Sequence, residues 1–336
     1  MSDLKHRLDK FLTNARQSLE VQQLTPDAST REYFRINWEG KSAIACVYPE
    51  SFVSEEQTYL DVSRLFASQG LPVAEIYSFD EALGIIVQED LGDTILRDVL
   101  SDSAQATREN LIAASIRLIA KIQSATNTAF ETGSVTSRLK FDSEKLLWEL
   151  SFFKEHYFQT LRKARLSSDQ EIGITQEFQS LSELLEIRAN VLCHRDFHAA
   201  NLMVDNAGNL RIIDHQDARI GSPTYDLVSL LLDRVTELPT NQWLLSKQRL
   251  LISERVSLGL DPIDEDEFAY EFRLQTVQRC LKAVGTFSFQ SVNRGKSYFI
   301  PYIKPMFEIV LRALTELQQF SVLRSVVEQQ LKVADF

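Results

Sequence analysis

The chain has 336 residues, of which 44% are hydrophobic and 25% charged, and its formal net charge is −11. This composition is typical of an ordinary globular protein with one large domain or two lobes. The negative charge argues against a surface that coats nucleic acid, although a local basic pocket for phosphate remains compatible with it.

No apolar run in the sequence reaches membrane-spanning length, and the first twenty residues predict an amphipathic charged helix and not a signal sequence. We therefore expect a cytoplasmic monomer without a membrane partner. The three cysteines, Cys46, Cys193 and Cys280, are far apart and form no C-x-x-C pair. This spacing indicates small core residues, not a disulfide framework or a structural zinc site.

The segment from about Asp27 to Leu91 has a strand-like pattern. "EYFRINWEG" alternates between apolar and polar residues, "KSAIACVYP" and "LGIIVQEDLGD" are short apolar runs, and "LPVAEIYSF" predicts a further strand. Between them, "SEEQTYLDVSRLFASQG" predicts a helix that is capped by Ser54 and ended by Gly70. The order of elements is β-β-α-β with one more strand.

After Gly92 the pattern becomes mostly helical. The exception is a predicted hairpin, in which "NLMV" and "LRIID" flank the turn "DNAGN". We therefore predict an α+β fold, with a small β-rich lobe at residues 1–90 and a large helical lobe at residues 91–336. The predicted helices are 106–123, 142–161, 175–189, 265–287 and a long final segment from residue 302.

The stretch "VLCHRDFHAANLMV" crowds four ionisable side chains into five residues between apolar runs. It contains H-R-D followed after four residues by Asn201, and "IIDH" lies just downstream. Phosphoryl transfer needs a carboxylate to accept the proton of the attacking hydroxyl, and an amide oxygen and a second carboxylate to hold Mg²⁺. In this interpretation Asp196 is the base, and Asn201 and Asp214 are the metal ligands.

Two other interpretations account for some of these residues. His194, Arg195 and Asp196 would form an ion-paired loop of purely structural value. Alternatively, the chain is a metallohydrolase, because H-x-x-x-H spacing occurs in metal sites. Its ligands would be His194, His198, Asp214 and His215. Neither alternative explains the base, the asparagine and the second aspartate in this order, so phosphoryl transfer is the favoured reading.

These motifs resemble the aminoglycoside phosphotransferase (APH/choline kinase-like) superfamily, whose fold is the two-lobe fold of protein kinases. The chain resembles more closely the bacterial N-acetylmuramate/N-acetylglucosamine anomeric kinase family. The narrower signals are "DASTREYFRI" and "QRCLKAVGTFSFQSVNRGKSYF", since the catalytic loop by itself indicates only the superfamily. The resemblance implies an ATP- and Mg²⁺-dependent kinase that phosphorylates a small amino sugar at its anomeric hydroxyl.

The resemblance also assigns roles to individual residues. It implies that Asp196 is the base, that Asn201 and Asp214 bind the metal, and that Asp226 in "TYDL" braces the catalytic loop. It places the adenine-binding hinge, which acts through backbone groups, at Gln88, Glu89, Asp90 and Leu91. An ordinary strand end is an equally good reading of any single hinge residue.

The sequence departs from protein kinases in the loop and strand that normally contact the phosphates. The loop "TPDASTREY" has no glycine, and "SAIACVYPE" has no lysine where the third strand usually provides one. Ser29 and Thr30 would then cradle phosphate oxygens, and Arg31 or Arg35 would supply the positive charge. Alternatively, these residues form an ordinary turn and a solvated strand.

Acceptor-binding residues are the least defined by the sequence. The resemblance makes seven residues candidates, and a helix cap or surface pair is an equal alternative for each. They are His198, Gln216, Asp217, Arg279, Asn293, Arg294 and Lys296. "NRGK" also differs from the "RDGK" that is usual in the family.

Two other functions remain open from the sequence. One is phosphoryl transfer to an aminoglycoside, a choline-like alcohol or a homoserine-like acceptor. The other is a catalytically silent nucleotide-binding module. The missing lysine favours this interpretation, whereas the presence of Asp196, Asn201 and Asp214 argues against it.

Overall fold

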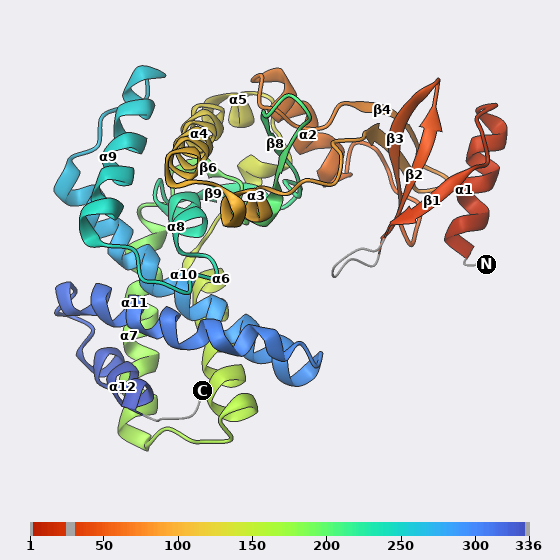
Figure 1. Cartoon of the computed structure of the whole chain (residues 1–336). Helices are drawn as coiled ribbons and strands as arrows, with labels where there is room; N and C mark the ends of the chain where they lie inside the picture. The colour runs from red at the N-terminus through yellow and green to blue at the C-terminus, as the bar shows by residue number, and fades with distance from the viewer. Residues whose placement is uncertain (1–2, 25–30, 333–336) are drawn as a thin grey trace. The chain divides into compact units, whose positions relative to one another are not determined.

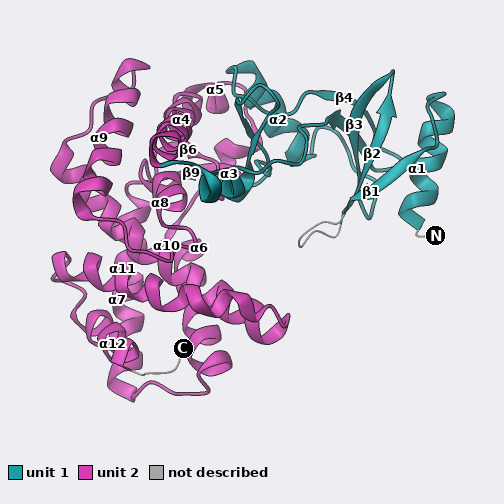
Figure 2. Cartoon of the chain, viewed as in Figure 1, with its two compact units in different colours: residues 1–104, 199–217 teal, residues 105–198, 218–336 magenta. Residues whose placement is uncertain are grey.

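The computed structural model describes residues 3–24 and 31–332. The chain forms two compact units (Figure 2). Unit 1 comprises residues 1–104 and 199–217, and unit 2 comprises residues 105–198 and 218–336. These bounds differ from the two predicted lobes because the hairpin around residue 206 packs with the N-terminal hundred residues. The function of the lobes as separate domains stays a prediction.

Unit 1 is built on a five-stranded antiparallel sheet with the strand order β1-β2-β3-β5-β4 (Figure 1). The strands predicted in "EYFRINWEG", "KSAIACVYP", "LPVAEIYSF" and "LGIIVQEDLGD" are all present. The first strand of the sheet was not anticipated. The elements of this part are α1 (Asp3–Asn14), β1 (Val21–Leu24), β2 (Glu32–Trp38), β3 (Lys41–Val47), α2 (Thr58–Ser68), β4 (Ile76–Asp80), β5 (Ile85–Glu89) and α3 (Leu96–Asp102).

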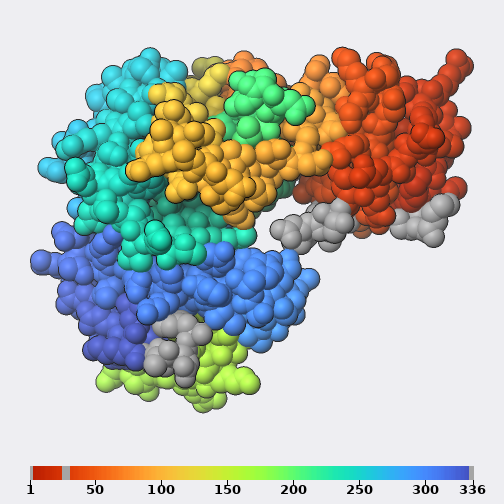
Figure 3. Space-filling view, viewed as in Figure 1, coloured from red at the N-terminus to blue at the C-terminus, as the bar shows by residue number. Residues whose placement is uncertain are grey.

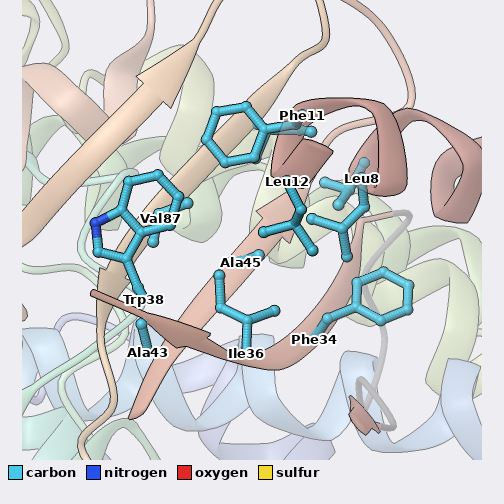
Figure 4. Packing of buried hydrophobic residues seen from close by; sticks show 11 residues of the cluster. Leu8, Phe11, Leu12, Phe34, Ile36, Trp38, Ala43, Ala45 and Val87 are labelled. Atoms are coloured by element: carbon cyan, nitrogen blue, oxygen red, sulfur yellow. The ribbon is translucent and has the colours of Figure 1, made fainter. Parts of the chain in front are cut away.

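The core of unit 1 lies between α1 and one face of this sheet (Figure 4). Leu8, Phe11 and Leu12 on the apolar side of α1 pack on alternate residues of β2, β3 and β5. Phe11 stacks on Trp38 with ring centroids 5.5 Å apart. Because side chains alternate across a strand, the opposite face of β2 and β3 carries the polar residues that are considered below.

Helix α2 begins later than the sequence pattern predicts. The predicted cap at Ser54 is wrong: the N-cap is Gln57, whose side chain accepts the N–H of Tyr59 at 3.3 Å. Ser54 instead belongs to a preceding turn, where its N–H is bound by the carboxylate of Glu81 at 3.1 Å. The predicted end is confirmed, since Gly70 follows the helix with φ +63°, a conformation that suits glycine.

The predicted hairpin is confirmed and forms part of unit 1. The short helix η3 (Ala199–Asn201) leads into β7 (Leu202–Val204), which pairs antiparallel with β8 (Leu210–Ile212). Bridges from Val73 to Ile212 and from Ile95 to Met203 join the hairpin to the N-terminal segment. This long-range pairing explains why unit 1 is discontinuous in the sequence.

Unit 2 is largely helical and is organised around α10 (Glu265–Asn293), a helix of 29 residues. In the space-filling view, the C-terminal residues, drawn in blue, lie together as one closely packed mass (Figure 3). All five predicted helical segments are present. The other elements are α4 (Gln105–Ser124), α5 (Thr126–Glu131), η1 (Val135–Arg138), α6 (Ser143–Phe153), η2 (Lys154–Leu161), α7 (Ser168–Glu186), β6 (Val191–Cys193), β9 (Arg219–Gly221), α8 (Tyr225–Leu232), α9 (Asn241–Ser257), η4 (Ser297–Tyr302), α11 (Ile303–Glu316) and α12 (Ser321–Lys332).

The cysteines behave as the sequence predicts. Cys46, Cys193 and Cys280 are all buried and unoxidised. Across residues 3–24 and 31–332, no helix combines the length and the apolar character that a membrane span needs.

Candidate active site

In unit 2, the predicted catalytic loop follows strand β6 and is held by Asp226. Strand β6 is fully buried and pairs with β9, so the loop begins at the end of a paired, buried strand. The carboxylate of Asp226 at the start of α8 accepts the backbone N–H of His194 at 2.7 Å and that of Arg195 at 3.0 Å. Arg195 has a φ of +84°, which is uncommon for a residue with a side chain. These are the contacts that a brace of the loop requires.

Asp226 is completely buried. Burial therefore raises the pKa of its carboxyl group to about 6, against the opposing effects of His194 and of the two backbone bonds. Ionisation of the Asp226 carboxyl group is therefore costly in the folded protein.

Asp196 lies next to two cations from α10. Arg279 Nη2 is 3.2 Å from Asp196 Oδ1, and Lys282 Nζ is 3.8 Å from the same oxygen. The Asp196 side chain is 31% exposed, so one part of it faces solvent. Burial opposes ionisation of this carboxyl group, but Lys282 and Arg279 outweigh it and hold its pKa well below the ordinary value. Asp196 is thus ionised at any physiological pH.

Lys282 is a residue of this cluster that the sequence analysis missed. It also approaches Glu149 Oε1 at 3.6 Å, and Glu149 Oε2 accepts a hydrogen bond of 2.7 Å from Gln278. Glu149 is 1% exposed, and burial lowers the pKa of Lys282. The available signal was the motif "QRCLKAVG", since residues 279 and 282 are three apart and share a helix face.

The glycine of the same motif explains how α10 approaches α6. A Cβ atom on Gly285 would lie 2.7 Å from the Cα of Phe153 and 3.0 Å from its nitrogen. Only a residue without a side chain permits this approach of two backbones. The close packing keeps Glu149 of α6 within reach of Lys282.

In unit 1, the two predicted metal ligands lie side by side at the base of the hairpin. Asn201 Nδ2 is 3.4 Å from Asp214 Oδ2, and Gln216 Nε2 donates to Asp214 Oδ1 at 2.7 Å. The N–H of Ile213 donates to the carbonyl of Asn201 at 3.1 Å. Asp214 has a φ of +60°, and the left-handed conformation costs a residue with a side chain about 1–2 kcal/mol. The surrounding contacts must therefore hold it.

Carboxylate and amide oxygens are hard ligands of the type that Mg²⁺ takes, usually one or two from the protein with the remainder from phosphates and water. The Asn201 and Asp214 pair fits that description. Within residues 3–24 and 31–332, no group of three or more His, Cys, Asp or Glu side chains is arranged to hold a metal. His215 is fully buried and bonded to Ser63, so it is not available as a ligand in the metallohydrolase alternative.

The residues predicted to contact the phosphates of ATP differ in their surroundings. Ser29 and Thr30 lie outside the described residues. Arg31 is held between the rings of Tyr33 and Tyr48, with its guanidinium carbon 5.7 and 5.5 Å from their centroids. Arg35, in contrast, is bound by carboxylates: its Nε is 2.8 Å from Asp90 and its Nη2 is 2.7 Å from Asp93.

Three side chains of the predicted hinge are occupied by structural contacts. Gln88 accepts the hydroxyl of Tyr59 at 2.6 Å, and Asp90 is bound by Arg35. Glu89 forms a two-pronged ion pair with Arg211 of β8, in which one contact is 2.9 Å. The predicted role of this segment is recognition of adenine by backbone groups, and these side-chain contacts are compatible with it.

Within unit 2, the residues predicted to bind the acceptor lie at two different places on the structure. Arg279 contacts Asp196 and donates to Ser229 at 2.8 Å, and His198 is in the catalytic loop itself. Arg294 is the C-cap of α10 and is exposed. Arg294 lies fifteen positions after Arg279, which corresponds to about 22 Å along the helix axis. This spacing argues against one small acceptor touching both.

The other acceptor candidates are distributed between the two units. Lys296 follows Arg294 just beyond the end of α10 and is half-buried. Asn293 is the last residue of α10 and is exposed. Asp217 and Gln216 belong to unit 1, where Asp217 is exposed. Their contact with an acceptor stays a prediction.

This arrangement, a β-sheet unit followed by helices with an H-R-D loop and a downstream aspartate, is that of a phosphotransferase. The chain belongs to the APH phosphotransferase enzyme family, whose model matches residues 20–256. It is 30% identical over 292 residues to the N-acetylmuramate/N-acetylglucosamine kinase of Neisseria meningitidis serogroup B, covering 86% of this chain and 84% of the relative. The kinase of the same name from Pseudomonas putida is 26% identical, covering 90% and 86%.

Solved structures agree on the fold. Choline kinase LicA from Streptococcus pneumoniae is similar with a TM-score of 0.56 and 15% identity, covering 94% of this chain and 100% of that one. The ADP-bound aminoglycoside phosphotransferase APH(2'')-Ib is similar with a TM-score of 0.57 and 12% identity, covering 90% and 97%. The predicted α+β fold and the predicted superfamily are therefore confirmed, and the protein is an enzyme of the kinase type.

Proposed function

We propose that this enzyme transfers the γ-phosphoryl group of ATP to the anomeric hydroxyl of N-acetylmuramate or N-acetylglucosamine. The observation that carries the proposal is the similarity, over most of the chain, to kinases named for these two sugars. In the reaction, the hydroxyl oxygen bonds to the γ-phosphorus as the bond to the β,γ-bridging oxygen breaks. The products are the sugar 1-phosphate and ADP.

Asp196 is the proposed acceptor of the hydroxyl proton. Its depressed pKa makes it a weak base, because Lys282 and Arg279 stabilise the charged form. A hemiacetal hydroxyl is more acidic than that of an ordinary alcohol, and phosphoryl transfer rests mainly on positioning and electrostatics. A weak base that is held rigidly by two cations is adequate for such a substrate.

Asn201 and Asp214 are the proposed ligands of Mg²⁺. Their juxtaposed oxygen-bearing side chains fit a hard cation. Bound Mg²⁺ would shield the charge of the β- and γ-phosphates. Arg31 is the proposed protein cation for the phosphates, since Arg35 is already neutralised by two carboxylates.

The charge around Asp196 favours an anionic or neutral acceptor over an aminoglycoside. Arg279 and Lys282 lie within 4 Å of its carboxylate, and Arg195 lies 3.8 Å from it. These three cations outnumber the two carboxylates that they contact, Asp196 and Glu149. The excess of positive charge would disfavour a polycationic acceptor and favour the lactyl carboxylate of N-acetylmuramate. The local cations also contrast with the net charge of −11.

The test is ADP release, measured by a coupled assay with a panel of acceptors. The panel contains N-acetylmuramate, N-acetylglucosamine, the 1-O-methyl glycoside of each, kanamycin and choline. We expect turnover of the free sugars, and none of the 1-O-methyl forms, in which the reacting hydroxyl is blocked. Turnover of kanamycin or choline alone would refute the proposal, and no turnover of any acceptor would favour a silent nucleotide-binding module.

A further inference from the structure

His215, the residue after Asp214, is one of the most constrained side chains of unit 1. It is fully buried. Its Nε2 lies 2.7 Å from the hydroxyl of Ser63 on α2. Its ring is stacked by Tyr59 at 4.9 Å and by Phe66 at 5.4 Å between centroids. Three residues of α2 thus contact His215, which is the residue next to a proposed metal ligand.

The backbone of Asp214 depends on its neighbours. With φ +60°, Asp214 is in the left-handed conformation, which costs free energy for a residue with a side chain, although aspartate adopts it more readily than most. On one side, the N–H of Ile213 is fixed by the carbonyl of Asn201 at 3.1 Å. On the other side, the anchor is His215 with its bond to Ser63. Asp214 is therefore held between two fixed residues.

The contacts that hold α2 in place explain why the position of Asp214 depends on His215. In protein kinases an ion pair between a strand lysine and a helix glutamate places the corresponding helix. Here the residues of β3 on the face away from α1 are Ser42, Ile44 and Cys46, and the acidic residues Glu55 and Glu56 precede α2 and are exposed. Helix α2 is joined instead by hydroxyl contacts, from Tyr59 to Gln88 on β5 and from Ser63 to His215.

We propose that His215 is a positioning residue: through its bond to Ser63, it keeps Asp214 in the conformation that sets the Asp214 carboxylate beside Asn201. The same contact joins α2 to the segment that carries Asp214. The inference rests on the metal-binding role proposed above for Asp214. It adds that a hydroxyl–imidazole bond made by the residue after Asp214 sets the affinity for the metal.

A double-mutant cycle tests this role. Ser63→Ala removes the hydroxyl, and His215→Phe keeps a ring for the stack while removing the nitrogen. Each single change removes one partner of the buried Ser63–His215 bond, whereas the double variant removes both. We expect the melting temperature to fall by about 4 °C in each single variant and to recover in the double one.

The second measurement is the affinity for Mn²⁺ in the presence of ADP, followed by the electron paramagnetic resonance signal of free Mn²⁺. If His215 positions Asp214, the affinity falls at least about tenfold in both single variants and stays low in the double variant, although its stability recovers. Ser63→Thr, which retains the hydroxyl, should preserve the affinity. Ser115→Ala is the matched control, because Ser115 is also a buried helical serine, bonded to the carbonyl of Leu111 at 2.8 Å.

The outcomes are distinct. Recovery of Mn²⁺ affinity together with stability in the double variant would show that the bond serves folding alone, and wild-type affinity in Ser63→Ala would overturn the inference even if the His215 variants do not fold. Failure of the wild-type protein to bind Mn²⁺ with ADP would refute the metal role of Asp214 and this inference with it. Because no sugar is present, a wrong assignment of the acceptor leaves all these results unchanged.

Discussion

Replacing Asp226 by asparagine should change how the stability of the protein depends on pH. Asp226 is buried, and its two oxygens accept the backbone N–H groups of His194 and Arg195. Asparagine keeps the shape and removes the charge, but its NH₂ group cannot accept one of the two bonds. Leaving a buried N–H unsatisfied costs about 1–3 kcal/mol, so the variant is expected to be less stable at low pH.

The pH dependence follows from the pKa of Asp226, which burial raises from 3.8 to about 6 in the folded protein. Because the folded state binds the proton more tightly, the stabilisation is complete below about pH 3.8 and is lost as the pH rises through 6. Linkage gives about 3 kcal/mol for the whole window, of which about 1.4 kcal/mol lies between pH 5 and pH 8. Asparagine cannot titrate and lacks this contribution.

The measurement is urea denaturation of wild type and Asp226→Asn, followed by circular dichroism at pH 5 and pH 8. The destabilisation caused by the substitution should be larger at pH 5 than at pH 8 by about 1.4 kcal/mol, since other groups titrate in both proteins and cancel. Asp102→Asn, a change at an exposed position of α3, is the control and should show the same small effect at both pH values. An equal effect of Asp226→Asn at both pH values would refute the reasoning.

Four further predictions concern individual side chains. Asp196→Asn should lower kcat by about 10²–10⁴-fold and retain ATP binding, and near-wild-type turnover would exclude Asp196 as the base. Asp214→Ala should abolish Mg²⁺-dependent ATP binding in calorimetry, because the carboxylate is a proposed metal ligand; unchanged Mg·ATP affinity would contradict that assignment. Arg31→Ala should raise the KM for ATP more than Arg35→Ala does, since Arg35 is bound by carboxylates, and equal effects would show that the two arginines are not distinguished in this way. Gly285→Ala should destabilise the protein by about 1–3 kcal/mol in denaturation experiments, as its Cβ would meet the Phe153 backbone at 2.7 Å, and an unchanged midpoint would mean that α10 can shift without cost.

Local sequence patterns were sufficient for most of the fold. The alternation in "EYFRINWEG", the apolar run in "KSAIACVYP" and the turn "DNAGN" predict strands and a hairpin that are all present. The spacing of Asp196, Asn201 and Asp214 in the sequence also predicts a catalytic loop, and the roles of these three residues stay predictions. Such features depend on residues within a few positions of one another, and the physics that produces them is equally local.

The tertiary structure decided the contacts between residues that are far apart in the chain. The N-cap of α2 is Gln57 and not Ser54, whose N–H is bound by Glu81 in the turn between β4 and β5. Nothing near His215 in the sequence points to Ser63, which is 152 residues away. Contacts of this kind become favourable only after helices and strands have packed, when burial makes an unpaired polar group costly and so selects its partner.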